Sequence, residues 1–242
     1  MQSKHLEAGI AVASIRELAE RFAAHTATAA RRARAGRGRY ALAVPGGSVA
    51  DQLLPALARA KIEWSCVDIF FCDERCVPRD SVDSNFAAVE RHLLEPLRRS
   101  PPRVHRMQGE DPDPFRAAQV YAETMHRILG TPPVLDLALL GVGEDGHVAS
   151  LFPGRPSLSV LDRVVIVEVA APKAPPRRLS LSLESLARAR ELVVAAFGSA
   201  KASAVGDALR NASSTLPLAL LLRRAGRVTV LLDEGAAAEL GP

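Results

Sequence analysis

The sequence has 242 residues, of which 48% are hydrophobic and 24% charged, enough to bury one sizeable core. Its 31 basic and 27 acidic residues leave a net charge of +4, which requires neither a nucleic-acid nor a membrane partner. No uncharged apolar run is long enough to cross a membrane, and the three cysteines form no disulfide or zinc pattern, so we expect a cytoplasmic protein with reduced thiols.

The predicted elements alternate between helices and short apolar strands. The first half contains a helix over 10–35, a strand over 40–44, a helix over 49–60, a strand over 67–71, a helix over 84–98, a proline-rich connection over 100–114 and a helix over 114–129. The second half contains strands over 134–140 and 163–170, a weakly alternating segment over 179–183, a strand over 191–197, a helix after 201, a strand over 227–232 and a helix over 234–240.

This alternation indicates an α/β fold with a mainly parallel sheet covered by helices on both faces. The proline-rich segments over 100–114 and 172–176 are interpreted as loops, because the α/β pattern continues beyond each of them. We therefore expect a single domain over residues 1–242. The basic run over 31–39 is interpreted as the exposed end of the first helix, stopped by glycine, rather than as a nucleic-acid patch.

In open α/β sheets, ligands bind beyond the carboxyl ends of the strands, so the turns after the strands are the candidate sites. The first such turn contains Gly46, Gly47 and Ser48. Glycines let backbone N–H groups approach an anion at a helix N-terminus, and we expect Ser48 to cap the helix and also to donate to a phosphate oxygen. An ordinary tight turn is the alternative interpretation of this segment.

The second turn follows two phenylalanines and contains Asp73, Glu74 and Arg75. Three charged residues are costly to bury together, so they either face the ligand crevice or pair with one another on the surface. Ser84 and Asn85 begin the next helix, where they form a helix cap or contribute to the same site. We include Asp73, Arg75 and Asn85 among the candidate site residues.

The segment over 141–154, Gly-Val-Gly-Glu-Asp-Gly-His-Val-Ala-Ser-Leu-Phe-Pro-Gly, is the most informative stretch. His147 stands among small residues at a strand end, and Asp145 is two positions away, close enough to orient or charge the ring. A histidine titrating near neutral pH suits general-base chemistry. A lone histidine is more often structural, and it is the surrounding segment that favours a functional role.

Two further cations are candidate anion ligands. Lys201 lies in the first turn of a helix, where a cation opposes the helix dipole, so an anion is expected beside it. Arg178 precedes the segment over 179–183, and its alternative role is that of a solvated arginine at a strand edge. Glycine-rich turns, one histidine and several cations together point to a small phosphorylated substrate, with no cofactor motif and no metal-ligand set.

In these residues the chain resembles the 6-phosphogluconolactonase family, over nearly its whole length. The segment over 141–154 is the most specific match, and the supporting motifs are Gly46-Gly47-Ser48, Asp73-Glu74-Arg75 with Ser84-Asn85, Arg177-Arg178-Leu179, Gly198-Ser199-Ala200-Lys201 and Leu232-Asp233-Glu234-Gly235. The resemblance implies a Rossmann-like fold shared with glucosamine-6-phosphate deaminase and ribose-5-phosphate isomerase.

Two local features separate the chain from the deaminases, which have the same glycine turn and Asp-Gly-His core. Arg75 stands where deaminases typically have tyrosine, and no Asn-Glu-Pro follows the histidine. Val148 departs from the lactonase pattern, which usually has threonine, but removes no proposed catalytic group. The alternatives are an isomerase or deaminase on this fold, or a non-catalytic sugar-phosphate regulator.

The resemblance implies hydrolysis of 6-phospho-D-glucono-1,5-lactone by a monomer without metal or cofactor. His147 would activate the water, Asp145 or Asp73 would orient the imidazole, and Arg75 would contact the oxyanion, hydroxyls or phosphate. Substrate and phosphate binding would fall to the remaining candidates, Gly46, Gly47, Ser48, Asn85, Arg178 and Lys201.

Overall fold

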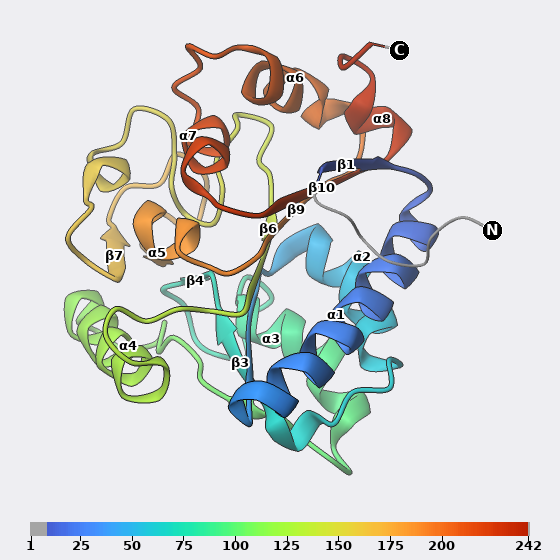
Figure 1. The fold of residues 1–242 in the computed structure, drawn as a ribbon. Coiled ribbons are helices and arrows are strands. Elements are labelled where there is room, and N and C mark those ends of the chain that lie inside the picture. Colours follow the sequence, from blue (N-terminus) through green and yellow to red (C-terminus); the bar gives the residue numbers. More distant parts are fainter. Residues whose placement is uncertain (1–8, 242) are drawn as a thin grey trace.

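The computed structural model describes residues 9–241, and a seven-stranded sheet runs through the centre of this part (Figure 1). All its strand pairs are parallel. In spatial order the strands are β1 (Gly9–Val12), β10 (Val228–Leu232), β9 (Leu192–Ala196), β6 (Leu137–Gly141), β2 (Tyr40–Val44), β3 (Val67–Phe71) and β5 (Arg103–Val104). Strands β2, β3 and β9 are buried along their whole length, as their continuous apolar sequences predict.

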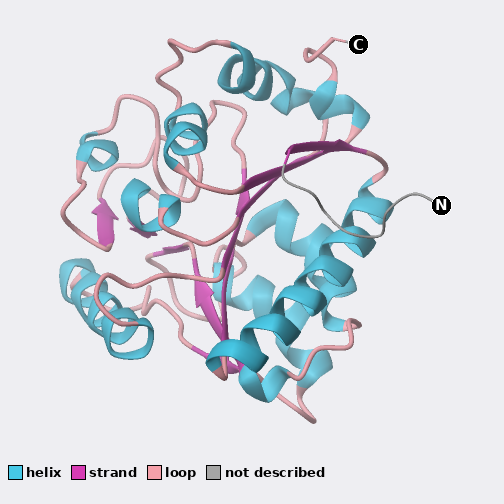
Figure 2. Cartoon of the chain, in the orientation of Figure 1, coloured by secondary structure: helices cyan, strands magenta, loops and turns pink. Residues whose placement is uncertain are grey.

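Helices cover both faces of this sheet, as Figure 2 shows. They are α1 (Ile15–Arg37), α2 (Gly47–Ala58), α3 (Asn85–Val89), α4 (Pro114–Leu129), α5 (Leu183–Ala187), α6 (Ala202–Arg210), α7 (Pro217–Arg224) and α8 (Glu234–Ala237). The predicted α/β class with a mainly parallel, two-sided sheet is therefore confirmed. None of the helices within residues 9–241 is both long and apolar enough to span a membrane.

A second, three-stranded sheet is antiparallel, with the order β4 (Asp73–Arg75), β8 (Arg178–Leu181) and β7 (Val165–Glu168). The strand predicted over 163–170 lies here rather than in the parallel sheet. The charged segment at Asp73 is itself a strand, because its backbone pairs with β8. This small sheet places two candidate site residues, Arg75 and Arg178, directly opposite each other.

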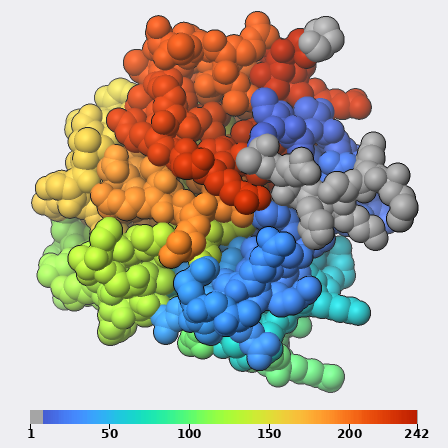
Figure 3. All heavy atoms as spheres, viewed as in Figure 1, coloured from blue at the N-terminus to red at the C-terminus, as the bar shows by residue number. Residues whose placement is uncertain are grey.

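The ends of the chain differ from the predicted elements. The predicted helix over 10–35 begins only at Ile15, because Ser14 caps it by accepting a hydrogen bond from the Glu17 N–H. The preceding residues instead form β1, which pairs with β10 and brings the blue and red surfaces together in Figure 3. Helix α7 was not predicted, although Pro217 at its first position is a typical start signal.

Two other predicted helices are interrupted or shortened. The helix expected over 84–98 is regular only in α3 and then passes through a π-turn (Glu90–Leu94) and a 3₁₀ turn (Glu95–Leu97). The last helix, expected over 234–240, ends at Ala237. Pro96 explains why the helix expected over 84–98 is interrupted, because proline has no N–H to donate to the carbonyl four residues earlier.

The basic run ends α1 at Gly38, whose φ of 74° is the left-handed conformation typical of a glycine stop. Its arginines are not simply solvated, however. Arg37 pairs with Asp136, and Arg39 donates to the Ile128 carbonyl at 2.7 Å. These two contacts therefore join the end of α1 to the segment before β6 and to α4.

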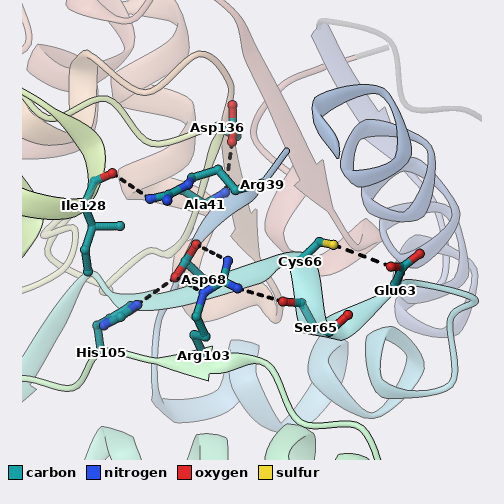
Figure 4. A network of polar contacts seen from close by, with 10 residues as sticks. All are labelled: Arg39, Ala41, Glu63, Ser65, Cys66, Asp68, Arg103, His105, Ile128 and Asp136. Carbon is teal, nitrogen blue, oxygen red and sulfur yellow. Dashed lines mark hydrogen bonds and ion pairs between the residues drawn. The ribbon is translucent and has the colours of Figure 1, made fainter. Parts of the chain in front are cut away.

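An ion cluster around Asp68 lies at the amino-terminal edge of the sheet, opposite to the strand ends expected to hold the site (Figure 4). The buried Asp68 carboxylate accepts two hydrogen bonds from Arg103 and one from His105, each 2.8 Å long. Burial raises the pKa of Asp68, but the hydrogen bonds from these two side chains outweigh it and hold the pKa well below its ordinary value. The cluster joins β3 to β5 and the chain that follows it.

Replacing Asp68 with asparagine is expected to lower the free energy of unfolding by about 2 kcal/mol, because charge-assisted hydrogen bonds are lost in a buried place. In the wild type this stabilisation is present above the unfolded pKa of about 3.9 and is lost as the pH falls. Urea denaturation at neutral pH measures the change, with the exposed Asp80→Asn as the matched control. Equal unfolding midpoints for the two variants would contradict the role given to this cluster.

Candidate active site

A cavity of about 130 Å³ lies at the carboxyl ends of β2, β6 and β9. From β2 the chain continues to β3 on one side of the sheet, and from β6 it continues by way of β7 and β8 to β9 on the other, so the cavity lies at a topological switch point. Its lining includes nine of the predicted site residues: Gly46, Gly47, Ser48, Asp73, Arg75, Asn85, His147, Arg178 and Lys201. The tenth, Asp145, contacts the side chain of His147 instead.

The glycine turn forms one wall of this cavity. Helix α2 begins at Gly47, with Gly46 as its N-cap and no side chain capping it. The prediction that Ser48 caps the helix is therefore wrong, because Ser48 lies inside the first turn. The first N–H groups of a helix have no intrahelical partner, and here no side chain satisfies them at the cap. This end of α2 is suited to hold an anion.

Gly46 is also required by a close approach. A Cβ at this position would lie 1.9 Å from Oδ1 of Asn85. The Asn85 amide donates to the carbonyl oxygen of Asp73 at 2.9 Å and to its carboxylate at 3.0 Å. Its own Oδ1 is buried without a hydrogen-bond partner.

Asp73 is buried and held from two sides. One carboxylate oxygen accepts from Asn85, and the other accepts from the Ser150 hydroxyl at 2.7 Å. No described hydrogen bond joins Asp73 to His147, so of the two carboxylates considered for orienting the imidazole, Asp73 is not the one in contact. Ser150 was not among the candidates, and its only sequence signal is its place inside the segment over 141–154.

Glu74 was also missed as a site-building residue. Its buried carboxylate accepts hydrogen bonds from the backbone N–H groups of Arg75, Asn85 and Phe86 and from the Ser84 hydroxyl. Burial raises the pKa of Glu74, and these donors offset part of that effect. Within residues 9–241, the side chains of residues 73–75 form no ion pair with one another, so the alternative that they pair on the surface is wrong. Glu74 instead holds the first residues of α3 through these hydrogen bonds.

His147 and Asp145 form a hydrogen-bonded pair. The Nδ1 atom of His147 lies 2.5 Å from Oδ1 of Asp145, and the Phe152 ring packs 4.5 Å from the imidazole, centroid to centroid. Burial lowers the pKa of His147, and the hydrogen bond to Asp145 offsets this only in part. The imidazole is therefore neutral at neutral pH. Since Nδ1 carries the proton shared with Asp145, Nε2 keeps a lone pair for use as a base.

The turn that presents this pair is tightly folded. Gly143 donates to the His147 carbonyl at 2.9 Å, and Gly146 donates back to Gly143 at 3.0 Å. Gly146 has a φ of 77°, and the non-glycine Ala149 has a φ of 49°. Val148 is fully buried and bridges both sides of the turn, so an apolar residue suits this position.

The three cations at the cavity are each partly engaged. Arg75 donates from Nη1 to the Asp83 carbonyl at 2.6 Å, while its buried Nε has no partner. Arg178 donates from Nε and Nη2 to carbonyls of the preceding loop. Lys201 forms an ion pair with Glu144 at 3.6 Å. Together they give the cavity an excess of positive charge over its one carboxylate, Asp73.

Within residues 9–241, no group of three or more histidine, cysteine, aspartate or glutamate side chains is arranged to hold a metal ion. What the site does provide is a base with its carboxylate, a helix N-terminus and three cations around one small cavity. Such an arrangement is suited to activating water beside an anionic substrate.

Comparison with known proteins supports this interpretation. The family described as glucosamine-6-phosphate isomerases/6-phosphogluconolactonase matches residues 13–230. A 6-phosphogluconolactonase of Streptomyces coelicolor is 37% identical over 236 residues, covering 92% of this chain and 90% of that protein. The human 6-phosphogluconolactonase is 35% identical over 212 residues, covering 83% and 81%.

Solved structures agree with the sequence relatives. The 6-phosphogluconolactonase of Trypanosoma brucei superposes with a TM-score of 0.85 at 26% identity, covering 98% of this chain and all of that one. A monomeric glucosamine-6-phosphate deaminase superposes with a TM-score of 0.74 at 17% identity, which shows a shared fold alone. The two relatives compared above are 6-phosphogluconolactonases, and the chain belongs to the glucosamine-6-phosphate isomerase/6-phosphogluconolactonase family.

Proposed function

We propose that this protein hydrolyses 6-phospho-D-glucono-1,5-lactone to 6-phospho-D-gluconate, a step of the oxidative pentose phosphate pathway. The observation that carries the proposal is the His147–Asp145 pair beside a cation-lined cavity, in a chain of this family. The pair supplies a base, and the cations suit a substrate that carries a phosphate. The arrangement thus fits both ends of a phosphorylated lactone.

In the proposed reaction, Nε2 of His147 takes a proton from a water molecule as the oxygen of that water attacks the lactone carbonyl. The carbonyl oxygen becomes an oxyanion, and stabilising it is the role that the proposal gives to Arg75. When the oxyanion collapses, the bond between the carbonyl carbon and the ring oxygen breaks. The imidazolium returns its proton to the ring oxygen, which leaves as a hydroxyl, and the carboxylic acid ionises.

The other residues bind rather than react in this mechanism. Asp145 holds the imidazole with Nε2 unprotonated, and Asp73 holds Asn85, whose free Oδ1 accepts from a sugar hydroxyl. The phosphate is assigned to the turn over 46–48, with Lys201 and Arg178 nearby. A lactone is an activated ester, so general-base catalysis, which contributes about 10²–10⁴-fold, suffices without a metal or cofactor.

A lactonase assay with freshly generated lactone, compared with spontaneous hydrolysis at the same pH, tests the proposal. We expect the purified protein to accelerate loss of the lactone in proportion to enzyme concentration. Release of ammonia from glucosamine 6-phosphate without lactonase activity would instead identify a deaminase. Binding of sugar phosphates without turnover of either substrate would identify a regulator.

Lys201→Ala is expected to raise KM for the phosphorylated lactone about tenfold, because one charge-assisted contact to the phosphate is lost. The kcat value should change little, since Lys201 is not assigned to the reacting atoms. Initial rates over a range of substrate concentrations separate the two parameters. Lys61→Ala, which removes a lysine from outside the cavity lining, is the control, and an unchanged KM for Lys201→Ala would remove this residue from the phosphate site.

We also propose that residues 1–242 act as one domain and as a monomer in the cytoplasm. The monomer is the state that the resemblance to the 6-phosphogluconolactonase family implies. The location is supported by relatives that are enzymes of sugar-phosphate metabolism. Light scattering at micromolar concentration tests the oligomeric state, and a dimer mass would contradict it.

A further inference from the structure

The loop over residues 169–177 joins β7 to β8 and is hydrogen-bonded to the wall of the cavity. Arg178, which lines the cavity and is 4% exposed, donates from Nε to the Pro175 carbonyl at 2.9 Å. Its Nη2 donates to the carbonyls of Lys173 at 2.9 Å and Ala174 at 3.3 Å. Ala171 closes the loop by donating to the Pro176 carbonyl at 2.8 Å. The guanidinium of Arg178 thus sets the position of the loop.

Arg178 also connects this loop to the histidine. Its guanidinium carbon lies 5.4 Å from the centroid of the Phe152 ring, and that ring packs against His147. The order of contacts from the base outward is therefore His147, Phe152, Arg178 and the carbonyl of Lys173. A residue carried by this loop stands at the rim of the proposed active site.

Lys173 is the exposed lysine of that loop, and its ammonium differs from the cations lining the cavity. Arg75, Arg178 and Lys201 each have a protein partner, as described above. Among the described residues, the Lys173 side chain has no hydrogen-bond or ion-pair partner. Its charge nevertheless reaches the active site, because it contributes to lowering the pKa of His147.

We propose that Lys173 is a further substrate-binding residue, whose ammonium pairs with the phosphate of the substrate at the rim of the cavity. Arg178 acts as its positioning residue by holding the Lys173 carbonyl. A phosphate ester carries nearly two negative charges at neutral pH, and an unpaired ammonium can pair with it without first breaking a protein contact. This inference rests on the proposed lactonase function and assigns part of its specificity for phosphorylated substrates.

Lys173→Ala tests the inference, with Arg177→Ala as a matched control. Arg177→Ala removes the same charge from the same loop, but the charge of Arg177 acts on Cys76, whereas that of Lys173 acts on His147. We expect Lys173→Ala to raise KM for the phosphorylated lactone about tenfold and to leave KM for unphosphorylated glucono-1,5-lactone unchanged. Lys173→Arg should retain most of the wild-type affinity, and Arg177→Ala should behave as the wild type.

Calorimetric titration with 6-phosphogluconate gives a measurement that does not depend on turnover. The inference predicts a Kd about tenfold weaker for Lys173→Ala only. Equal Kd values for the wild type and both alanine variants would overturn it, even where the wild type is active. Equal losses of kcat on both lactones would also overturn it, because they would place Lys173 at the carbonyl. A wild type that fails to hydrolyse the lactone overturns the proposed function, and the Kd comparison still decides the role of Lys173.

The pH profile adds a readout that a merely structural residue would not move. Asp145, Asp73 and Lys173 are the charged groups that act on His147, and of these only Lys173 disfavours the imidazolium. Removing its charge therefore raises the pKa of His147, and the acid limb of kcat/KM moves to higher pH. An acid limb that stays in place in Lys173→Ala, as it should in Arg177→Ala, would contradict the proximity of Lys173 to the base.

Discussion

Replacing His147 with alanine is expected to lower kcat for lactone hydrolysis by about 10²–10⁴-fold, the usual contribution of a general base. The physical reason is that Nε2 is the atom assigned to take the proton from water, and alanine offers none. Asp145 cannot replace it, because that carboxylate bonds to Nδ1, on the far side of the ring. Stopped-flow measurement of proton release, corrected for spontaneous hydrolysis, provides the rate.

The matched control for this variant is His126→Ala. His126 is half-buried on α4, pairs with Thr131 and does not line the cavity. It should turn over as the wild type does, and His147→Ala should still bind 6-phosphogluconate with an affinity near that of the wild type. A kcat close to wild type in His147→Ala would exclude the general-base role of His147. The next candidate base would then be Asp73, whose carboxylate lines the cavity.

The parallel sheet could be predicted from the sequence because its inner strands must be mainly apolar along their whole length. Strands β2, β3 and β9 are buried on both faces, so their sequences are continuously apolar and stand out from the surrounding helices. The rule that ligands bind at carboxyl strand ends then placed the cavity residues. The second sheet lacked this signal, because β4 consists of three charged residues and holds its place by backbone pairing with β8.

The limits of prediction at the site have a similar cause. Asp145 and His147 are two positions apart, so local sequence was enough to suggest their contact. Ser150 reaches Asp73 across 77 positions, and Glu74 binds backbone N–H groups that any residue type could provide at those positions. Contacts of these two kinds depend on how the chain folds back, and the residue types alone do not reveal them.

Replacing Gly143 with alanine is the second change expected to abolish most activity, although it adds only a methyl group. The new Cβ would lie 1.9 Å from Nδ1 of His147, 2.1 Å from its Cε1 and 2.5 Å from Oδ1 of Asp145. All three distances are far inside van der Waals contact. The imidazole ring is rigid, and the backbone of His147 is held by the hydrogen bond from the Gly143 N–H to the His147 carbonyl. The ring must therefore rotate away, and its bond to Asp145 must break.

Misplacing a catalytic group by about 1 Å can cost about 100-fold in rate, so we expect at least that loss of kcat in Gly143→Ala. The methyl group displaces the base and its carboxylate but none of the proposed phosphate ligands, so binding of 6-phosphogluconate should weaken much less than kcat falls. Gly226→Ala is the control, because a Cβ there meets no atom within 4 Å. Steady-state kinetics alongside thermal unfolding separates a displaced imidazole from a destabilised fold. A folded Gly143→Ala with wild-type kcat would mean that the reaction does not require His147 in the orientation set by Asp145.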